Sequence, residues 1–183
     1  MHQNDFVIRP ANHEDAEILA KVGRETFIET FGRLYSKENL AAFINKSHTP
    51  ELYRAMAGDP DVGLWIAQTG AGEVVGYAVA CPCSLPVPCI PPNSGELARL
   101  YLAAGAQGTG LGARLLETAL DFLRSRFDHV YLSVYSENVK AQRLYERYGF
   151  IKIHDYFYMV GDHADPEWIM KLVRERDLNQ NPR

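Results

Sequence analysis

The sequence predicts an α/β fold, because segments with β-strand and helix patterns alternate along a chain of ordinary domain length. The chain has 183 residues, within the range of roughly 50 to 250 that single domains span, so we expect one domain over residues 1–183. Hydrophobic residues make up 46% of the chain and charged residues 23%, which excludes a disordered, collagen-like or coiled-coil chain.

The first third of the chain is predicted to be one short strand followed by three helical segments. Apolar residues at spacings of three and four indicate a helix that begins at Asn12 or His13 and breaks or bends near Gly23. Thr49 followed by Pro50 has the form of an N-cap with proline at the first helical position. The expected elements are a strand at 6–9, the helix after Asn12, a helical segment from Ser36 and a helix at 50–57.

The middle of the chain is predicted to contain three strands. Residues 64–69 and 74–80 have strand composition, and the glycines between them are typical of a hairpin turn. A proline-rich loop at 81–92 follows, long enough to form a lid over a site, and residues 96–103 then form a buried strand.

The second half is predicted to continue with alternating helices and strands. Apolar residues recur over four turns from Leu111 to Phe127, which indicates an amphipathic helix. Asn138 can cap a helix over 139–148, and Gly149 can end it in the left-handed conformation. The other expected elements are strands at 130–135, 151–159 and 168–173, a long loop at 161–166 and a frayed tail from Arg174.

Charge and hydropathy exclude some partners. The chain carries 19 Lys and Arg against 23 Asp and Glu, a net charge of -4, so it offers no basic field for a nucleic-acid backbone. No run of about 18 apolar residues suggests a membrane span, and the first residues have no apolar signal segment. We expect a cytoplasmic protein that binds neither nucleic acid nor membrane.

The three cysteines fall in the proline-rich loop, as Cys81, Cys83 and Cys89. An odd number argues against a disulfide scaffold. A zinc site would need a histidine from elsewhere in the chain, so we favour small hydrophobic residues in a rigid loop and expect no metal.

The most informative segment is a glycine-rich loop between a strand and a helix, at Gln107 to Ala113. The start of a helix offers unpaired N–H groups and a positive dipole, so this loop is suited to a pyrophosphate. A Walker loop would need Lys and Ser or Thr after its last glycine, and Leu111 and Gly112 follow Gly110 here.

Two other interpretations of the glycine loop remain. Gly108, Gly110 and Ala113 satisfy the G-x-G-x-x-A dinucleotide pattern, with Asp128 about 20 residues further on. That acid precedes a strand rather than ending one, and the pattern begins too late in the chain for the fold it belongs to. The other interpretation is a glycine-rich turn with no ligand.

The segment from Gln107 to Gly112 resembles the Q/R-x-x-G-x-G/A acetyl-CoA signature of the GCN5-related N-acetyltransferases. A second segment, from Asn138 to Phe150, is similar to the later N-x-x-A-x-x-x-Y-x-x-x-G-F helix of that family. Ile8-Arg9-Pro10 is similar to the opening strand of many members. The resemblance implies the acyl-CoA N-acyltransferase fold: a mixed central sheet with two splayed parallel strands, and helices on both faces.

A narrower resemblance concerns the acceptor. The segments at 25–32, 96–101, 156–159 and 168–170 look like those of the bacterial spermidine/spermine N-acetyltransferases of the PaiA type. The resemblance implies acetyl-CoA as cosubstrate and a small-molecule amine, such as spermidine or spermine, as acceptor. A protein N-terminus, an aminoglycoside and a non-catalytic CoA-binding module remain alternatives, and the protein is expected to be a monomer or a homodimer.

The resemblance also implies where acetyl-CoA binds. Backbone groups of Leu100, Tyr101 and Leu102 match those that bind pantetheine, and the Leu102 N–H is placed to polarise the thioester carbonyl. Asn138 matches a residue that bonds the cofactor, and it can cap its helix as well. Amides that would hold the pyrophosphate come from Gln107, Gly108, Thr109, Gly110, Leu111, Gly112 and Ala113.

Two side chains are candidates for proton transfer. Tyr145 matches the tyrosine that protonates the departing thiolate in many relatives, although its helical stripe also suits a core aromatic. Glu96 is the candidate base, acting through water on an amine attacking directly in a ternary complex, and the alternative is a surface glutamate at a strand end.

Overall fold

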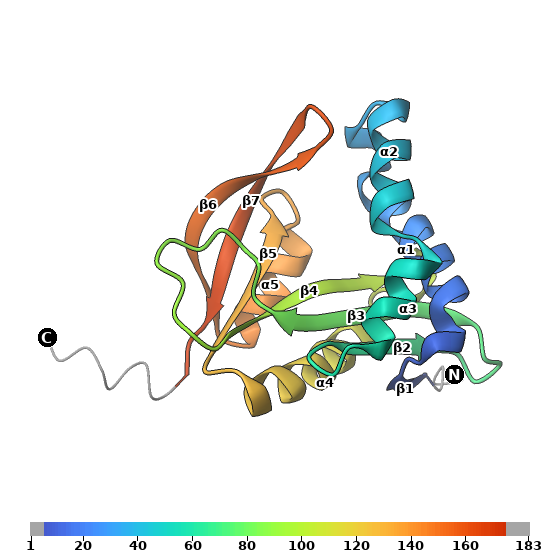
Figure 1. Cartoon of the computed structure of the whole chain (residues 1–183), viewed down its shortest axis with the longest axis horizontal. Helices are drawn as coiled ribbons and strands as arrows, with labels where there is room; N and C mark the ends of the chain where they lie inside the picture. The colour runs from blue at the N-terminus through green and yellow to red at the C-terminus, as the bar shows by residue number, and fades with distance from the viewer. Residues whose placement is uncertain (1–5, 175–183) are drawn as a thin grey trace, which may run out of the picture.

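A seven-stranded mixed sheet forms the centre of the computed structural model, which describes residues 6–174 (Figure 1). The strand order is β1-β2-β3-β4-β5-β7-β6, and β4 and β5 are the parallel neighbours. The strands are β1 (Val7–Pro10), β2 (Gly63–Gln68), β3 (Val74–Pro82), β4 (Ser94–Leu102), β5 (His129–Tyr135), β6 (Phe150–Val160) and β7 (His163–Leu172).

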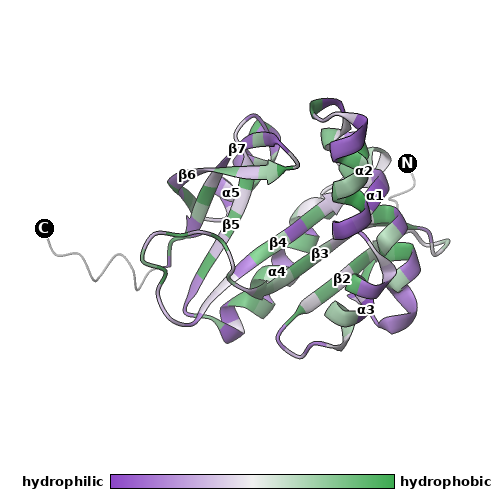
Figure 2. Ribbon diagram, turned by 45° about the horizontal axis from the view of Figure 1, so that its top comes forward, coloured by the Kyte–Doolittle hydropathy of each residue, from purple (hydrophilic) through white to green (hydrophobic). Residues whose placement is uncertain are grey.

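Helices cover both faces of this sheet. The α-helices are α1 (Ala16–Phe31), α2 (Lys37–Ser47), α3 (Pro50–Gly58), α4 (Leu111–Arg126) and α5 (Val139–Arg147). Side chains alternate along β2, so Leu64 and Ile66 pack with α1 and α3, whereas Trp65 and Ala67 pack with α4. Figure 2 shows the central strands as mostly hydrophobic between these layers. The expected fold, with helices on both faces of a mixed sheet, is confirmed.

The parallel pair β4–β5 is short. Ser94 to Leu97 pair with His129 to Leu132, and the pairing ends there. At the same point the register between β3 and β4 shifts, so that Ala98 is an extra residue between the pairs Leu97–Ala80 and Arg99–Val79. A bulge of this kind bends its strand. Figure 1 shows β5, β6 and β7 diverging from β4 beyond the bulge, which leaves one edge of β4 open.

Helix starts follow the capping chemistry expected from the sequence. The Thr49 hydroxyl accepts a hydrogen bond from the Leu52 N–H at 3.2 Å, and Pro50 is the first residue of α3. The Asn138 side chain accepts from the Ala141 N–H at 3.2 Å at the start of α5. Gly149 follows α5 with φ at +90°, the left-handed conformation predicted for it.

Two expectations about the elements are wrong. Helix α1 runs through Gly23 without a break. A side-chain carbon at Gly23 would lie 2.4 Å from His48 Nδ1 and 2.5 Å from the Tyr53 hydroxyl, so this glycine serves close packing and not a helix break.

The second error is the long loop predicted at 161–166. Strand β7 begins at His163, because Asp165 and Pro166 pair with Tyr158 and Phe157 of β6. Only a tight turn at Gly161 joins the two strands. Proline cannot donate a hydrogen bond to a neighbouring strand and is rare inside sheets, so Pro166 and its polar neighbours favoured a loop over a strand in the sequence.

Two further observations concern the ends and the helices. The tail expected to fray from Arg174 falls on residues 175–183, outside the part of the chain described. Within residues 6–174, none of the helices has the length and apolar character needed to cross a membrane.

The first helical turn after β1 rests on one carboxylate, which yields a stability prediction. Asp15 accepts hydrogen bonds from both terminal nitrogens of Arg9 at 2.8 and 2.7 Å and from the Asn12 N–H at 2.9 Å. The Arg9 guanidinium lowers the pKa of Asp15, so its contribution is complete above the ordinary Asp pKa of about 4 and is lost as pH falls through the lowered value. Because Arg9 is partly exposed, we expect Asp15→Asn to cost about 1–2 kcal/mol at pH 7 in urea unfolding.

Glu14→Gln, in the same turn but exposed, is the matched control and should change the unfolding free energy little. The gap between wild type and Asp15→Asn should shrink as the pH is lowered toward 3. An equal gap at pH 7 and pH 3 would contradict the role given to the Asp15 charge.

Candidate active site

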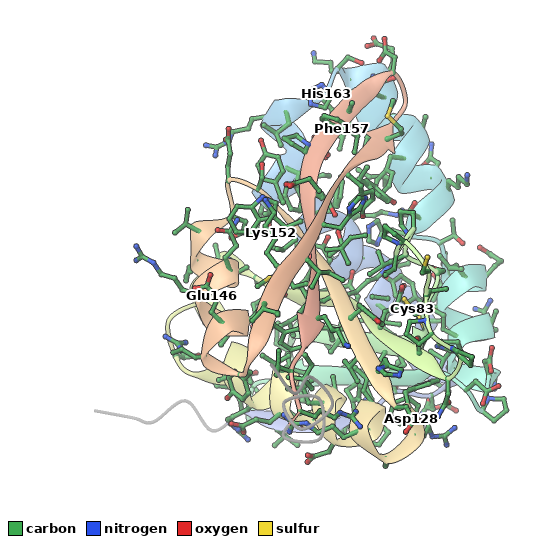
Figure 3. All side chains as sticks on the ribbon, turned by 90° about the vertical axis from the view of Figure 1, so that its left-hand side faces the viewer. Cys83, Asp128, Glu146, Lys152, Phe157 and His163 are labelled. Atoms are coloured by element: carbon green, nitrogen blue, oxygen red, sulfur yellow. The ribbon has the colours of Figure 1, made fainter. Side chains whose placement is uncertain are left out.

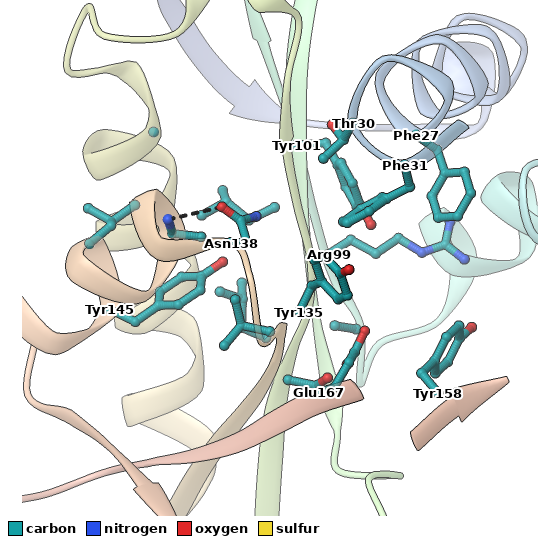
Figure 4. Close-up of a pocket in the computed structure, with 18 of the residues that line it drawn as sticks. Phe27, Thr30, Phe31, Arg99, Tyr101, Tyr135, Asn138, Tyr145, Tyr158 and Glu167 are labelled. Atoms are coloured by element: carbon teal, nitrogen blue, oxygen red, sulfur yellow. Dashed lines mark hydrogen bonds between the residues drawn. The ribbon is translucent and has the colours of Figure 1, made fainter. Parts of the chain in front are cut away.

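A cavity of about 800 Å³ opens where β4 and β5 diverge. One part is lined by the loop before α4 and by α5, and the other by α1, α2, β6 and β7. In the close-up of Figure 4, Asn138 and Tyr145 lie on one side of the central strands, and Phe27, Arg99 and Tyr158 lie on the other. The cavity therefore joins two chemically different halves through the gap between two strands.

The loop before α4 has the geometry of an anion cradle. Gly108 and Gly110 adopt φ values of +80° and +86°, which side chains rarely adopt, and a carbon added at either position would meet nothing within 4 Å. Gly110 precedes α4 and has no side chain to cap it, and the Leu111 N–H at the start of the helix donates to the Thr109 hydroxyl at 3.4 Å. The next N–H groups of the first turn, those of Gly112 and Ala113, have no intrahelical carbonyl to bond, so they are available to a negatively charged ligand.

Most of the predicted cofactor-binding residues line this cavity, and two do not. Those that do are Leu100, Tyr101, Leu102, Gln107, Gly108, Gly110, Gly112, Ala113 and Asn138. Leu111 is 1% exposed and packs in the core beneath α4. Thr109 turns its hydroxyl onto the Ala106 carbonyl oxygen at 2.8 Å, which stabilises the loop from behind.

The open edge of β4 can hydrogen-bond an extended ligand. The Ala103 N–H donates to the Val75 carbonyl of β3 at 2.8 Å. Because successive N–H groups of a strand point to opposite sides, Leu102 and Leu100 direct theirs toward the gap. Tyr101 has the same parity as Ala103, so its backbone faces β3, contrary to the expectation that it bonds pantetheine. Its contribution to the cavity is its ring (Figure 4).

Gln107 and Lys140 connect the glycine loop to α5. The Gln107 side chain donates to the Leu102 carbonyl at 3.3 Å and accepts from Lys140 Nζ at 3.1 Å. Lys140 and Arg147 both line this half of the cavity, which adds positive charge beside the α4 N-terminus.

Tyr145 lies on the inner face of α5, with 7% of its surface exposed. Its ring contacts Phe150 edge-on at 6.0 Å, yet its hydroxyl points into the gap (Figure 4). Burial, with a smaller effect of Glu167, raises the pKa of Tyr145, so the hydroxyl keeps its proton at neutral pH. The residue is both a core aromatic and a proton donor facing the cavity.

Glu96 is neither exposed nor at the splayed part of β4. It lies in the paired part, opposite Tyr131, and is 6% exposed. Its carboxylate accepts from the Ser84 and Leu85 N–H groups at 2.8 and 3.1 Å, and from the Ser84 hydroxyl at 3.3 Å. The expectation of a surface glutamate is wrong, and the carboxylate that was our candidate base holds the proline-rich loop against the cavity wall.

The carboxylate best suited to act as a general base is Glu167 on β7, which the sequence analysis did not identify. Burial raises the pKa of Glu167 to about 7, and Asp165 adds to the shift. Glu167 Oε2 accepts from the Tyr156 hydroxyl at 2.9 Å, and Tyr156 contacts the Ser133 hydroxyl at 2.8 Å. The signal in the sequence is the pair of acidic residues, Asp165 and Glu167, just before Trp168. Interpreting residues 161–166 as a loop hid the fact that both belong to a strand.

The cysteines form no metal site in the residues described. Burial raises the pKa of both Cys81 and Cys83 to about 12, so both remain thiols. Cys89 is exposed, and all three are free. No group of three or more His, Cys, Asp or Glu side chains between residues 6 and 174 has the arrangement of a metal site.

Comparisons with known proteins agree on one family. The model of the acetyltransferase (GNAT) family matches residues 25–150. The chain is 30% identical over 165 residues to an uncharacterised N-acetyltransferase of Mycobacterium tuberculosis, covering 88% of this chain and 97% of that one. It is 36% identical over 56 residues to a spermine/spermidine N(1)-acetyltransferase of Bacillus subtilis, covering 30% of this chain and 37% of that one.

A solved structure shows the same fold. The PaiA N-acetyltransferase of Thermoplasma acidophilum, crystallised with coenzyme A, superposes with a TM-score of 0.73 at 23% identity. The match covers 92% of this chain and 98% of that one.

The position of Glu96 predicts how the proline-rich loop behaves. The Ser84 and Leu85 amides both donate to Oε2 of Glu96, so Glu96→Gln leaves them one accepting oxygen but removes its negative charge, and two charge-assisted hydrogen bonds become weaker neutral ones. We expect amide hydrogen exchange across residues 83–92 to accelerate by about tenfold, with Glu73→Gln in the exposed β2–β3 turn as the unaffected control. Unchanged exchange together with a lost pH dependence of turnover would instead support Glu96 as a base.

Proposed function

The chain belongs to the acetyltransferase (GNAT) family, and from that premise we propose that it transfers the acetyl group of acetyl-CoA to a primary amine of a small molecule. The amine attacks directly in a ternary complex, with no acetylated enzyme. One observation carries the proposal: a single cavity passes between β4 and β5 and has an anion cradle in one half and a carboxylate with a pKa near 7 in the other. The sheet from Val7 to Leu172 supports one domain over residues 1–183.

The residues of the first half fit acetyl-CoA. Amides from Gly108 to Ala113 would hold its phosphates, helped by Lys140 and Arg147. The open edge of β4 at Leu100 and Leu102 would pair with the pantetheine amides, and Asn138 lies beside them at the cavity wall. When bound, acetyl-CoA supplies a thioester with an activated carbonyl and a thiolate leaving group.

Two donors of this chain serve the acetyl transfer. The Leu102 N–H, directed into the gap, stabilises negative charge that develops on the carbonyl oxygen, a contribution of about 3 kcal/mol where such donors are fixed in place. The Tyr145 hydroxyl, protonated at neutral pH, donates its proton to the leaving sulfur as the C–S bond breaks.

Glu167 accepts the proton that the amine must lose before it attacks. An amine with pKa near 10.4 is neutral in only about one in 2,500 molecules at pH 7, so a base is needed. The nitrogen loses two protons in all, one before and one after the C–N bond forms. One replaces the proton given up by Tyr145, and the other leaves through Glu167 to solvent.

A polyamine is one acceptor for this chemistry. The short match to a spermine/spermidine acetyltransferase supports it, and so does the acidic pair Asp165 and Glu167 in the second half. A protein N-terminus, an aminoglycoside and a non-catalytic CoA-binding module are the alternatives that a direct assay separates.

That assay is thiol release from acetyl-CoA by the purified protein, with spermidine, spermine, an aminoglycoside, an N-terminal peptide and amino acids tested separately. The proposal expects amine-dependent release with at least one small amine. Silence with every amine, while acetyl-CoA still raises the melting temperature, would contradict turnover and favour the CoA-binding module.

Tyr145→Phe should lower kcat about 100-fold and leave the KM for acetyl-CoA within about twofold, because only the proton donor is removed. Tyr148→Phe, at the residue that follows the same helix and donates its hydroxyl to Glu117, is the matched control and should keep wild-type kinetics. Equal kcat in Tyr145→Phe and wild type would remove the general acid from the account.

Glu167→Gln should change the pH profile as well as the rate. A base must be deprotonated to act, so wild-type kcat/KM for the amine should rise with pH through about 7. In Glu167→Gln that limb should disappear and kcat/KM should fall about 100-fold at pH 8. Glu146→Gln, on the outer side of α5 (Figure 3), is the control, and the same limb persisting in Glu167→Gln would assign it to another group.

A further inference from the structure

Arg99 places a positive charge in the half of the cavity that faces away from the glycine loop. It is the first residue of β4 after the bulge at Ala98, opposite Val79 of β3. Its side chain extends toward Phe27 and Tyr158, on the opposite side of the strands from Asn138 and Tyr145 (Figure 4). The bulge therefore positions a guanidinium where an acceptor would bind.

The partners of Arg99 are all uncharged. Its Nη1 donates to the Tyr53 hydroxyl at 2.8 Å, and the guanidinium lies 5.4 Å from the centre of the Tyr53 ring. Tyr53 in turn contacts the Tyr77 hydroxyl at 3.1 Å and His48 Nδ1 at 2.9 Å. Burial, and then the charges of Arg99 and Arg24, lower the pKa of His48 to about 3, so this imidazole is neutral.

No carboxylate among the described residues pairs with Arg99 within 4.0 Å, although other arginines of the chain have such partners. Arginine stays protonated in proteins and offers five N–H donors, of which the Tyr53 contact uses one. A partly buried guanidinium without a counter-charge is costly to the folded protein. Its free donors are therefore suited to a carboxylate supplied by a ligand.

The negative group that would pair with Arg99 is not supplied by the carboxylate of Glu96 or by the cosubstrate. Glu96 is committed to the Ser84 and Leu85 amides. The phosphate cradle at Gly108 and Gly110 lies on the other side of β4, so the phosphates of the cosubstrate do not reach Arg99. The acceptor is the remaining source.

A carboxylate that can take the acceptor's ammonium lies across the same half. Asp165 and Glu167 each accept one hydrogen bond, from the Tyr35 and Tyr156 hydroxyls. Asp165 is buried, at 3% exposure, beside His163, whereas Glu167 is only partly buried and can be reached from the cavity. Burial raises the pKa of Tyr158, Arg99 opposes the shift, and Glu167 adds to it, so both charges act on this one ring. Arg99 and Glu167 both line this cavity, and Tyr101 and Tyr158 line it with them.

We propose that the acceptor is a small primary amine that carries a carboxylate, as a free amino acid does, with its ammonium at Glu167 and its carboxylate at Arg99. Phe27, Phe31 and Tyr158 then contact its side chain. A polyamine would bring a second cation toward Arg99, which opposes binding. This inference rests on the proposed function and specifies its substrate class.

The test compares matched acceptors in the thiol-release assay: the twenty amino acids, their primary amides, the decarboxylated amines, and spermidine. For the amino acid that reacts best, we expect kcat/KM at least about tenfold above that of its amide and its decarboxylated amine, expressed mainly in KM. Arg99→Gln should abolish the preference for the acid over the amide and leave the KM for acetyl-CoA unchanged. Arg99→Lys, which keeps the charge, should retain part of it.

The controls separate folding from recognition. Arg24→Gln, which removes another arginine bonded to this region through the His48 carbonyl, should keep the acid preference. The melting temperature of Arg99→Gln shows whether this variant folds. The comparison between the amino acid and its amide is made with wild-type protein, so it remains valid even if Arg99→Gln does not fold. Turnover of spermidine or amides above that of every amino acid would overturn this inference and leave the proposed function standing. No turnover with any amine would overturn the proposed function itself.

Discussion

Beyond Leu97 the backbone of β4 has no strand partner on its β5 side, and this open edge determines the placement of the rest of the site. The Leu102 carbonyl accepts a hydrogen bond from the Gln107 side chain, whereas the N–H groups of Leu100 and Leu102 face the cavity, where a ligand can supply the partners they need. The bulge at Ala98 ends the parallel pairing, turns Leu100 and Leu102 toward the gap and sends the Arg99 side chain to the far side of the sheet. One local irregularity in the strand therefore creates the binding edge and separates the two halves of the cavity.

The two halves carry different arrangements of charge: the first favours anions, and the second holds one positive and one negative side chain, Arg99 and Glu167. Around the start of α4, unpaired amides, Lys140 and Arg147 favour anions. In the other half, Glu167 lies among aromatic rings that desolvate it, so its pKa rises toward neutrality while Asp165 remains tied to Tyr35. Tyr145 lies at the boundary, buried enough to stay protonated and close enough to the gap to donate. With this arrangement, the cosubstrate and the acceptor bind in separate halves of the cavity and meet at the gap between β4 and β5.

Local signals made much of the fold predictable from sequence. Helix ends are set by contacts within a few residues, as at Thr49-Pro50, Asn138 and Gly149. The glycine loop could be identified because it directly precedes an amphipathic helix. The parts that failed depend on distant neighbours. Gly23 was interpreted as a bend because the close approach of His48 and Tyr53 comes from residues far along the chain. The candidate base moved from Glu96 to Glu167 once the structure was seen. Glu96 is bound by loop amides and Glu167 is desolvated, and residue spacing reveals neither environment.

The most direct test of this account is a crystal structure of the protein with coenzyme A. The account predicts that the pantetheine hydrogen-bonds to the β4 edge at Leu100 and Leu102, that the phosphates lie on the amides between Gly108 and Ala113, and that the sulfur lies within hydrogen-bonding reach of the Tyr145 hydroxyl. Coenzyme A bound elsewhere, or a sulfur directed away from Tyr145 with the β4 edge left unpaired, would contradict it.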